Sequence, residues 1–323
     1  MTLNKKMGIC EPIDQLKLYG YEDYFRTFEG LYKKNKLPNA ILLSGPKGLG
    51  KSTFAYHFIN YLLSQSETNK YSLEKFIINE NSSTLKSIQN HIHPNFFLLE
   101  NNLSEENIKI NQVRDLLNFL GKSTYSRDIK IVLLDNAEYL NPNSSNALLK
   151  SLEEINYNTF FFIINNSLLS VPDTIKSRCI EYKFHFNALE KKNIFNKIAQ
   201  DYQSNFIEIN LDKFFYFDTP GNLLRYMLLL NNSNLNISID HLSCILYLID
   251  IYKNEKDLEL LNLVSIFIEN FYNELSLYDS INSNRYFFNK YKILYLINDM
   301  KNFNLDKKNL ITSVTRILEN EKK

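Results

Sequence analysis

Short apolar runs alternate with amphipathic segments over the first part of the chain. Runs at 40–44, 96–99, 129–135 and 159–165 are apolar and only four to seven residues long, as expected for strands buried on both faces of a sheet. A fifth strand is expected at 180–186. Between these runs, apolar residues recur at three- and four-residue spacing, which is typical of one helix face. The alternation predicts a parallel sheet covered by helices on both faces.

The helical spacing also locates individual helices within this part of the chain. We expect one or two helices in residues 13–36, one directly after residue 53, a short one around 85–88, one for which Asn111 is the N-cap, and one at 146–154.

The pattern becomes purely helical after residue 186. Residues 188–230 alternate apolar groups with polar gaps and predict a small helical domain, and an Asn-rich linker follows at 231–236. Residues 238–323 carry Leu, Ile, Phe and Tyr at helical spacing throughout. The many Tyr and Phe residues favour packing over a base-stacking platform, because few basic residues are interleaved with them. A chain of 323 residues is also too long for a single core.

The segment Gly45-Pro46-Lys47-Gly48-Leu49-Gly50-Lys51-Ser52, followed by Thr53, matches the phosphate-binding pattern G-x-x-x-x-G-K-[ST]. It joins a predicted strand to a predicted helix, which is the context that the pattern requires. The backbone N–H groups of such a loop surround phosphate oxygens, and the helix N-terminus adds a favourable field. Lys51 is expected to reach the outer phosphates, and Ser52 to ligate Mg²⁺. The expected ligand is ATP or ADP with Mg²⁺.

Polar residues end two of the predicted strands beside this loop. Asp135 is placed to hold the Mg²⁺ shell, and a capping role is the alternative. Asn136 follows it where related nucleotide hydrolases usually carry a glutamate. Since an amide cannot take up a proton as a carboxylate does, hydrolysis is expected to be poor, and substitution by Glu138 stays open. Asn165 is expected to touch a γ-phosphate or a water molecule, or to cap a turn.

Charge and cysteine content narrow the function classes. The formal net charge is +1, from 37 basic and 36 acidic residues, so nucleic-acid contact must be local or shared with partners. Cys10, Cys179 and Cys244 are far apart and odd in number, which argues against disulfides and zinc and favours a reducing cytoplasm. No apolar run approaches a membrane span, so we expect a cytoplasmic protein without membrane contact.

Taken together, these residues resemble the AAA+ subunits of the bacterial replicative clamp loader of DNA polymerase III. The specific parts are Asn-Ala-Leu-Leu-Lys-x-Leu-Glu-Glu at 146–154 and Ser-Arg-Cys at 177–179. The resemblance covers about the first 230 residues, and the other matching segments are 38–40, 45–53, 93–96, 110–114, 135–138 and 174–179.

The resemblance implies a fold of the α/β plus all-α class. An AAA+ P-loop domain would span 1–186, a helical lid 187–234 and a helical collar 235–323. The collar would assemble a circular hetero-pentamer with gamma/tau and delta subunits, which contacts the sliding clamp and primer–template DNA. Arg178 would be an arginine finger in the ATP site of the neighbouring subunit, and a local salt bridge or helix cap is the alternative.

The sequence departs from the family pattern at two places. Gly221 stands where active loader ATPases carry a lid arginine, and Arg225 lies one turn later. Residues 64–92 contain no cysteine, although loader subunits often carry a four-cysteine zinc module there, so zinc is not expected.

The sequence therefore favours a clamp-loader subunit that binds nucleotide with little or no hydrolysis and acts on the site of its neighbour. An ATP-hydrolysing motor subunit of the gamma/tau type is the alternative, opposed by Asn136 and Gly221. A stand-alone P-loop kinase would need an acceptor pocket and a pair of lid arginines, which the sequence does not offer. The intact Lys51-Ser52-Thr53 opposes a structural collar protein with a vestigial loop.

Overall fold

A computed structural model describes residues 10–101, 107–122, 129–166, 171–202, 218–231, 241–255, 258–302 and 307–322. The chain divides into two compact units, residues 1–203 with 215–225 and residues 204–214 with 226–323. The three-domain boundaries expected from the sequence stay a prediction.

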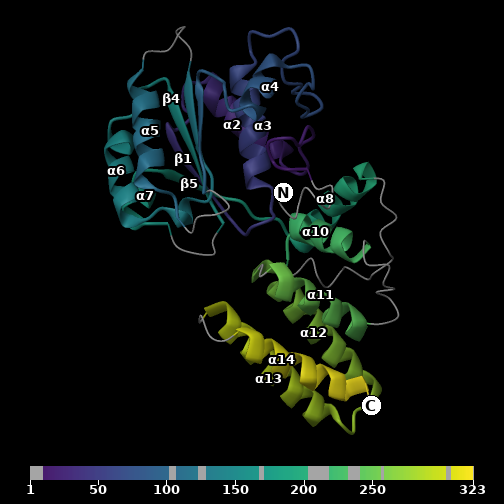
Figure 1. The fold of residues 1–323 in the computed structure, drawn as a ribbon. Coiled ribbons are helices and arrows are strands. Elements are labelled where there is room, and N and C mark those ends of the chain that lie inside the picture. Colours follow the sequence, from purple (N-terminus) through teal and green to yellow (C-terminus); the bar gives the residue numbers. More distant parts are fainter. Residues whose placement is uncertain are drawn as a thin grey trace. The chain divides into compact units, whose positions relative to one another are not determined.

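A parallel sheet forms the centre of the first unit (Figure 1). It has five strands in the order β2-β3-β4-β1-β5. All residues of β1, β3 and β4 are buried, as their largely apolar sequences predicted. The strands are β1 (Ala40–Ser44), β2 (Phe96–Leu99), β3 (Lys130–Leu134), β4 (Thr159–Asn165) and β5 (Ile180–Lys183).

Helices cover both faces of the sheet. On one face lie α2 (Glu22–Lys33), α3 (Lys51–Leu63) and α4 (Ser83–Gln89), and on the other lie α5 (Ile110–Gly121), α6 (Pro142–Glu153) and α7 (Asp173–Lys176) (Figure 1). Successive strand residues point to opposite faces. Ile41 and Leu43 therefore join the core beneath α3, and Leu42 joins the core beneath α5 and α6.

Element ends differ from the prediction at three places. The fifth strand ends at Lys183, although the Phe184 N–H still donates to the Ser44 carbonyl at 2.9 Å. The rings of Phe184 and Phe186 pack edge-on against the ring of Tyr21. Asn111 as an N-cap is wrong. The cap of α5 is Lys109, whose backbone N–H donates to the Gln112 side chain at 2.9 Å.

Helix α6 starts four residues earlier than its apolar pattern indicated. Its N-cap is Asn141, whose side chain accepts a hydrogen bond from the Ser144 backbone N–H at 2.8 Å. Pro142 occupies the first helical position, where its fixed φ and missing N–H cost nothing. In residues 13–36 the structure has one helix, α2.

The rest of the described chain is helical. Helix α8 (Ala188–Asp201) belongs to the first unit, and α10 spans Pro220–Asn231. In the second unit α11 (His241–Glu255), α12 (Leu258–Tyr278), α13 (Ser283–Asn302) and α14 (Lys307–Glu319) each pack on the next, α14 also contacts α11, and a 3₁₀ turn covers Asn320–Lys322. None of the helices in the described ranges has the length and apolarity to cross a bilayer. The expected fold class, an α/β P-loop domain followed by helical parts, is confirmed.

Candidate nucleotide-binding site

The phosphate-loop sequence lies between β1 and α3, at the carboxyl edge of the sheet. Gly48 and Gly50 have φ values of 78° and 93°, a left-handed conformation that favours glycine, and Gly50 is the N-cap of α3. The loop thus leads directly into a helix N-terminus, where backbone N–H groups favour anions.

Lys51 is the first residue of α3 and is almost fully buried. Its ammonium donates hydrogen bonds to the carbonyl oxygens of Gly45 at 2.9 Å and Pro46 at 2.7 Å, so it lies within its own loop. Burial lowers the pKa of Lys51 to about 8, although the charges of Asp135 and Glu138 act in the opposite direction. A negatively charged ligand at the loop would stabilise the protonated form of Lys51.

Ser52 of α3 and Asp135 after β3 meet, although β1, which leads into α3, and β3 are not neighbours in the sheet. Asp135 directly follows β3, and its Oδ2 accepts a hydrogen bond from the Ser52 hydroxyl at 3.0 Å. Burial raises the pKa of Asp135, while the Ser52 hydroxyl, the Asn136 backbone N–H and Lys51 lower it. A hydroxyl paired with a carboxylate beside a phosphate loop fits Mg²⁺, which prefers oxygen ligands. The structure brings Ser52 and Asp135 together beside Lys51. Their roles in binding nucleotide and Mg²⁺ stay predictions.

The turn after β3 directs its side chains toward the end of β4. Asn136 is left-handed, with φ 59°, and its Oδ1 accepts a hydrogen bond from the Asn166 side chain at 2.6 Å. Glu138 lies in the 3₁₀ turn Ala137–Tyr139, and its Oε2 accepts from the Asn166 backbone N–H at 3.4 Å. The amide of Asn136 is therefore engaged by Asn166.

Asn165 is the last residue of β4 and is buried. It lies opposite Ser44 in the sheet, and its carbonyl oxygen accepts a hydrogen bond from the Gly45 backbone N–H at 3.3 Å. The structure thus places Asn165 beside the start of the phosphate loop. Its contact with a nucleotide stays a prediction.

The beginning of α10 touches the phosphate loop, a contact that the sequence analysis missed. The Thr219 hydroxyl donates to the Lys47 carbonyl at 2.8 Å, and the Gly221 N–H donates to the Gly48 carbonyl at 3.0 Å. Asp218 accepts hydrogen bonds from the Thr219 N–H and the Asn222 side chain, at 2.7 and 2.9 Å. The only sequence signal was Thr-Pro-Gly before an apolar helix, which marks a helix start but names no partner.

A pocket opens on the side of the loop that faces α8 and α10, and the sequence analysis did not find it. The loop contributes Gly48, Leu49 and Gly50, and the hydroxyl of the buried Tyr21 donates to the Leu49 carbonyl at 3.0 Å. Its apolar walls include Leu18, Tyr21, Leu49, Ile194, Ile198 and Leu224. An apolar pocket directly beside a phosphate-binding loop suits the flat face of a nucleotide base.

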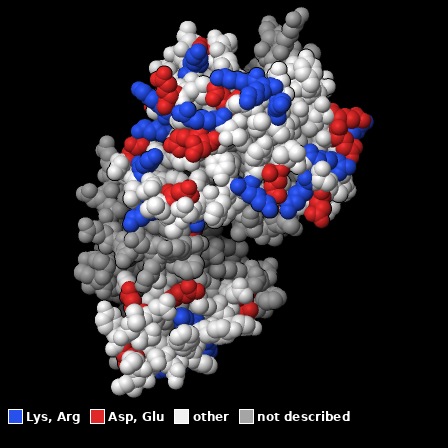
Figure 2. Space-filling model, turned by 180° about the vertical axis from the view of Figure 1, so that it is seen from behind, with Lys and Arg blue, Asp and Glu red and all other residues white. Residues whose placement is uncertain are grey.

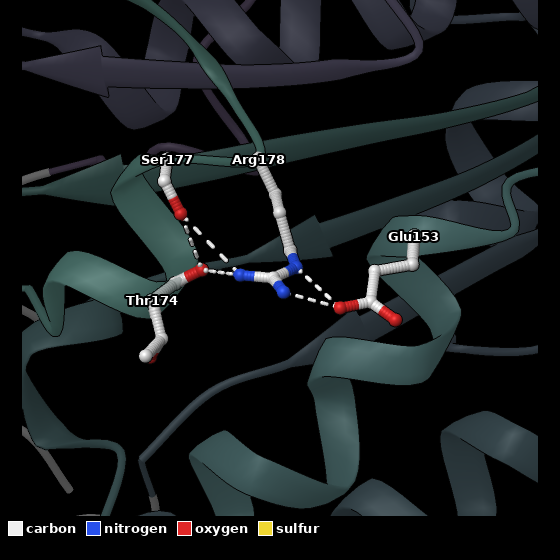
Figure 3. A network of polar contacts seen from close by, with 4 residues as sticks. All are labelled: Glu153, Thr174, Ser177 and Arg178. Atoms are coloured by element: carbon white, nitrogen blue, oxygen red, sulfur yellow. Dashed lines mark hydrogen bonds and ion pairs between the residues drawn. The ribbon is translucent and has the colours of Figure 1, made fainter.

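Arg178 lies at the amino end of the strands, opposite the carboxyl edge where the phosphate loop lies. It precedes β5, which runs parallel to β1 with Ile180 opposite Ile41, whereas the phosphate loop follows the carboxyl end of β1. Its guanidinium is ion-paired with Glu153 at the end of α6, with Nε 2.9 Å from Oε1 (Figure 3). Nη1 donates to the Thr174 carbonyl at 2.7 Å and to the Ser177 hydroxyl at 3.3 Å (Figure 3).

In the segment where zinc was considered, a carboxylate organises the chain. Glu67 accepts hydrogen bonds from the backbone N–H groups of Ser83 and Thr84, at 3.1 and 2.7 Å, and from the hydroxyls of Ser82, Ser83 and Thr84. Burial raises the pKa of Glu67, but these hydrogen bonds outweigh burial and lower it. Among the described residues no group of three or more His, Cys, Asp or Glu is arranged to hold a metal ion. The absence of zinc stays a prediction.

A phosphate-loop sequence after β1, an aspartate after β3 and the strand order β2-β3-β4-β1-β5 define a P-loop α/β domain of the AAA+ type. Residues 20–188, more than half of the chain, match the sequence model of the family "DNA polymerase III, delta subunit". The chain belongs to this family. The resemblance to clamp-loader subunits, in particular the delta-prime type, is confirmed.

Individual relatives carry two names. DNA polymerase III subunit delta' of Pseudomonas aeruginosa is 36% identical over 143 residues, which are 44% of this chain and 42% of the relative. Subunit gamma of Buchnera aphidicola subsp. Schizaphis graminum is 26% identical, over 68% of this chain and 60% of the relative. Subunit delta' of Buchnera aphidicola subsp. Acyrthosiphon pisum is 28% identical, over 70% of this chain and 76% of the relative. The alignments thus span less than two thirds of the first two relatives.

Proposed function

We propose that this chain is a clamp-loader subunit of DNA polymerase III that binds ATP or ADP with Mg²⁺, hydrolyses it little or not at all, and supplies Arg178 to the ATP site of a neighbouring subunit. The observation that carries the proposal is a complete phosphate-binding set, Lys51, Ser52 and Asp135, beside a residue 136 that lacks a carboxylate. The chain thus has the side chains that bind a nucleotide but lacks the carboxylate that usually activates water to hydrolyse it.

Nucleotide binding follows from the charges and donors at the loop. Lys51 and the N–H groups at the start of α3 bind the phosphates, and Ser52 and Asp135 hold the magnesium ion. Bound magnesium neutralises phosphate charge. The base lies in the apolar pocket beside Leu49.

Slow hydrolysis follows from two residues. Asn136 cannot take a proton from an attacking water molecule, and its amide is engaged by Asn166. Gly221 provides no guanidinium at the lid position, and Arg225 lies one helical turn further along α10. The gamma-type motor subunit remains the second candidate, because gamma subunits are among the relatives.

The finger role of Arg178 is supported by its position. Strands rise roughly 3.3 Å per residue, so the four paired residues of β5 keep Arg178 more than roughly 10 Å from its own phosphate loop. Its side chain is 30% exposed, and Thr174 and Glu153 hold it in place. A guanidinium is permanently charged and forks onto phosphate oxygens, so Arg178 can bind a γ-phosphate of an adjacent subunit.

Assembly through the second unit is supported by an aromatic face. Phe287, Phe288, Tyr291 and Tyr295 of α13 are each more than half exposed, and so are Leu277, Tyr278 and Ile281 before it. Exposed apolar patches of this kind mark protein interfaces. We assign this α13 aromatic face to contact with the other loader subunits, gamma/tau and delta, in a circular hetero-pentamer.

Clamp and DNA contacts belong to the whole complex. On the face shown in Figure 2, Lys and Arg side chains lie interspersed with Asp and Glu. Such a surface does not create the single-sign field that attracts nucleic acid from a distance. Contact with primer–template DNA and the sliding clamp is therefore shared with the partner subunits, in the cytoplasm.

Co-assembly tests the proposal most directly. The tagged full chain is co-expressed with the gamma/tau and delta subunits of its own organism and purified through the tag. We expect a stable complex that loads a sliding clamp with ATP. Recovery of the chain without these subunits would remove the proposed function.

Nucleotide titration of the purified chain is the second test. We expect binding of ATP and ADP with Mg²⁺, loss of binding in Lys51→Ala, and negligible phosphate release, since loss of a positioned base typically costs about 10²–10⁴-fold. Turnover at the rate of a motor subunit, lost in Lys51→Ala, would establish the gamma-type alternative instead.

A further inference from the structure

Glu138 is a buried acid with an unsatisfied oxygen. Glu138 is only 8% exposed, and its Oε1 has no hydrogen-bond partner within the described part of the chain. The other oxygen has one long contact, 3.4 Å from the Asn166 backbone nitrogen. A buried carboxylate oxygen without a partner lowers the stability of the fold, so its presence requires an explanation.

The location of Glu138 indicates what its partner is. Glu138 lies on the turn that begins at Asp135, and its contact residue Asn166 directly follows Asn165, which pairs with Ser44 just before the phosphate loop. In parallel sheets, ligands bind where the carboxyl ends of the strands meet. The charge of Glu138 also raises the pKa of both Lys51 and Asp135, so it acts within the same site.

We propose that Glu138 is a positioning residue of the magnesium–nucleotide site, whose unpaired Oε1 accepts a hydrogen bond from a water ligand of the bound magnesium ion. This inference rests on the proposed nucleotide binding. Mg²⁺ retains several waters in protein sites, and those waters are donors that need acceptors. Ser52 and Asp135 would bind the magnesium ion directly. Asn136 has no carboxylate to accept hydrogen bonds from the water ligands, and its amide oxygen already accepts one from Asn166. Glu138 is the acid that satisfies the water shell.

A simpler role for Glu138 would be that of a counter-ion for Lys51. The two roles differ in their dependence on the metal. A counter-ion acts on the lysine whether or not magnesium is present, so its loss changes the affinity for ATP equally with Mg²⁺ and with EDTA. An acceptor for a magnesium-bound water acts only when the metal is present.

The test measures ATP affinity of the full chain by calorimetric titration, once with Mg²⁺ and once with EDTA. We expect Glu138→Gln to weaken binding of ATP with Mg²⁺ by roughly tenfold or more, the usual range for a charge-assisted hydrogen bond. Its affinity in EDTA should stay within about twofold of the unmodified chain. Glu154→Gln, the same substitution at an exposed acid that ends α6, is the matched control and should change neither value.

Thermal unfolding provides a readout that does not involve binding affinity. Without nucleotide, Glu138→Gln should melt no lower than the unmodified chain, because an amide replaces a buried carboxylate whose Oε1 has no partner among the described residues. With ATP, the extra stabilisation from adding Mg²⁺ should shrink in this variant. Glu138→Asp, which keeps the charge at a shorter reach, should retain part of that stabilisation.

The outcomes separate this inference from the proposed function. An unmodified chain that binds no ATP would overturn both. Loss of binding in Lys51→Ala, together with unchanged magnesium dependence in Glu138→Gln, would overturn the role of Glu138 alone. Equal weakening in Mg²⁺ and EDTA would show a counter-ion of Lys51 and would also overturn it.

Discussion

The backbone N–H of Gly221 donates a hydrogen bond to the carbonyl oxygen of Gly48 at 3.0 Å, so the start of α10 rests directly on the phosphate loop. A Cβ atom at position 221 would lie only 2.6 Å from that oxygen. The place that the family resemblance assigns to a lid arginine is therefore filled by a backbone contact. Any side chain at this position has to separate the helix from the loop.

The first prediction concerns whether replacing a glycine by alanine raises or lowers the free energy of unfolding. Gly221→Ala should lower the free energy of unfolding by about 1–3 kcal/mol, because the added methyl group clashes with backbone. Gly30→Ala in α2 is the matched control: its Cβ would meet nothing within 4 Å. It should stabilise by roughly 0.5–1 kcal/mol, the helix preference of alanine over glycine. Equal effects in urea unfolding would contradict the close contact.

The second prediction concerns Arg178. In a reconstituted loader, Arg178→Ala should reduce the ATP hydrolysis that clamp and DNA stimulate. The activity lost should be that of the one ATP site which Arg178 contacts, because an arginine finger raises the rate at its site by about 10³–10⁵. Arg178→Lys should restore only part, since a point charge replaces the fork. Glu153→Gln removes the charge of the ion-pair partner but keeps an oxygen that accepts from the guanidinium, so it should retain activity. Full clamp loading with Arg178→Ala would remove the finger role.

The third prediction is a pH dependence of nucleotide affinity. Lys51 has a pKa of about 8 in the free chain, and bound phosphates would raise it. Affinity for ATP should therefore change little between about pH 7 and 8 and fall as pH rises above 8, by up to about tenfold per unit. Lys51→Arg keeps its charge and should bind with little pH dependence, though less tightly. A flat profile from pH 7 to about 9.5 for the unmodified chain would contradict a buried, charged Lys51 at the phosphates.

The fourth prediction concerns the α13 aromatic face. Phe288→Ser and Tyr291→Ser should each reduce recovery of the loader complex about tenfold or more, since buried aromatic anchors dominate interface energies. Folding should be unaffected, because both residues are exposed. Tyr157→Ser, at an equally exposed tyrosine before β4, is the control and should assemble normally. Normal recovery of both α13 variants would place the interface elsewhere.

The fifth prediction concerns the segment around Glu67 and the question of zinc. Elemental analysis should find no stoichiometric zinc, and EDTA should leave the melting temperature unchanged. Glu67→Gln should lower stability by roughly 1–3 kcal/mol, because five hydrogen bonds at the start of α4 lose their charged acceptor. Glu74→Gln, an exposed acid nearby, should have little effect. A zinc ion released by EDTA with unfolding would overturn this interpretation.

Strands and the phosphate loop were predictable because their signals are local. The runs that form β1 and β4 are apolar except at their ends, since both faces of the sheet are covered by helices. The loop pattern requires left-handed glycines and a lysine at set spacings, and the structure has them at Gly48, Gly50 and Lys51. Helix starts were less predictable: Asn111 has the right chemistry for a cap, but the chain turns at Lys109.

The sequence by itself determined which residues line the phosphate loop and that an aspartate lies at the carboxyl end of the third strand, directly after it. The tertiary structure decided which distant groups meet them. Thr219 reaches Lys47 across 172 positions, and Arg178 reaches Glu153 across 25. Periodicity reports only which face of a helix or strand is apolar, whereas these contacts depend on strand order and on how each helix packs over the sheet.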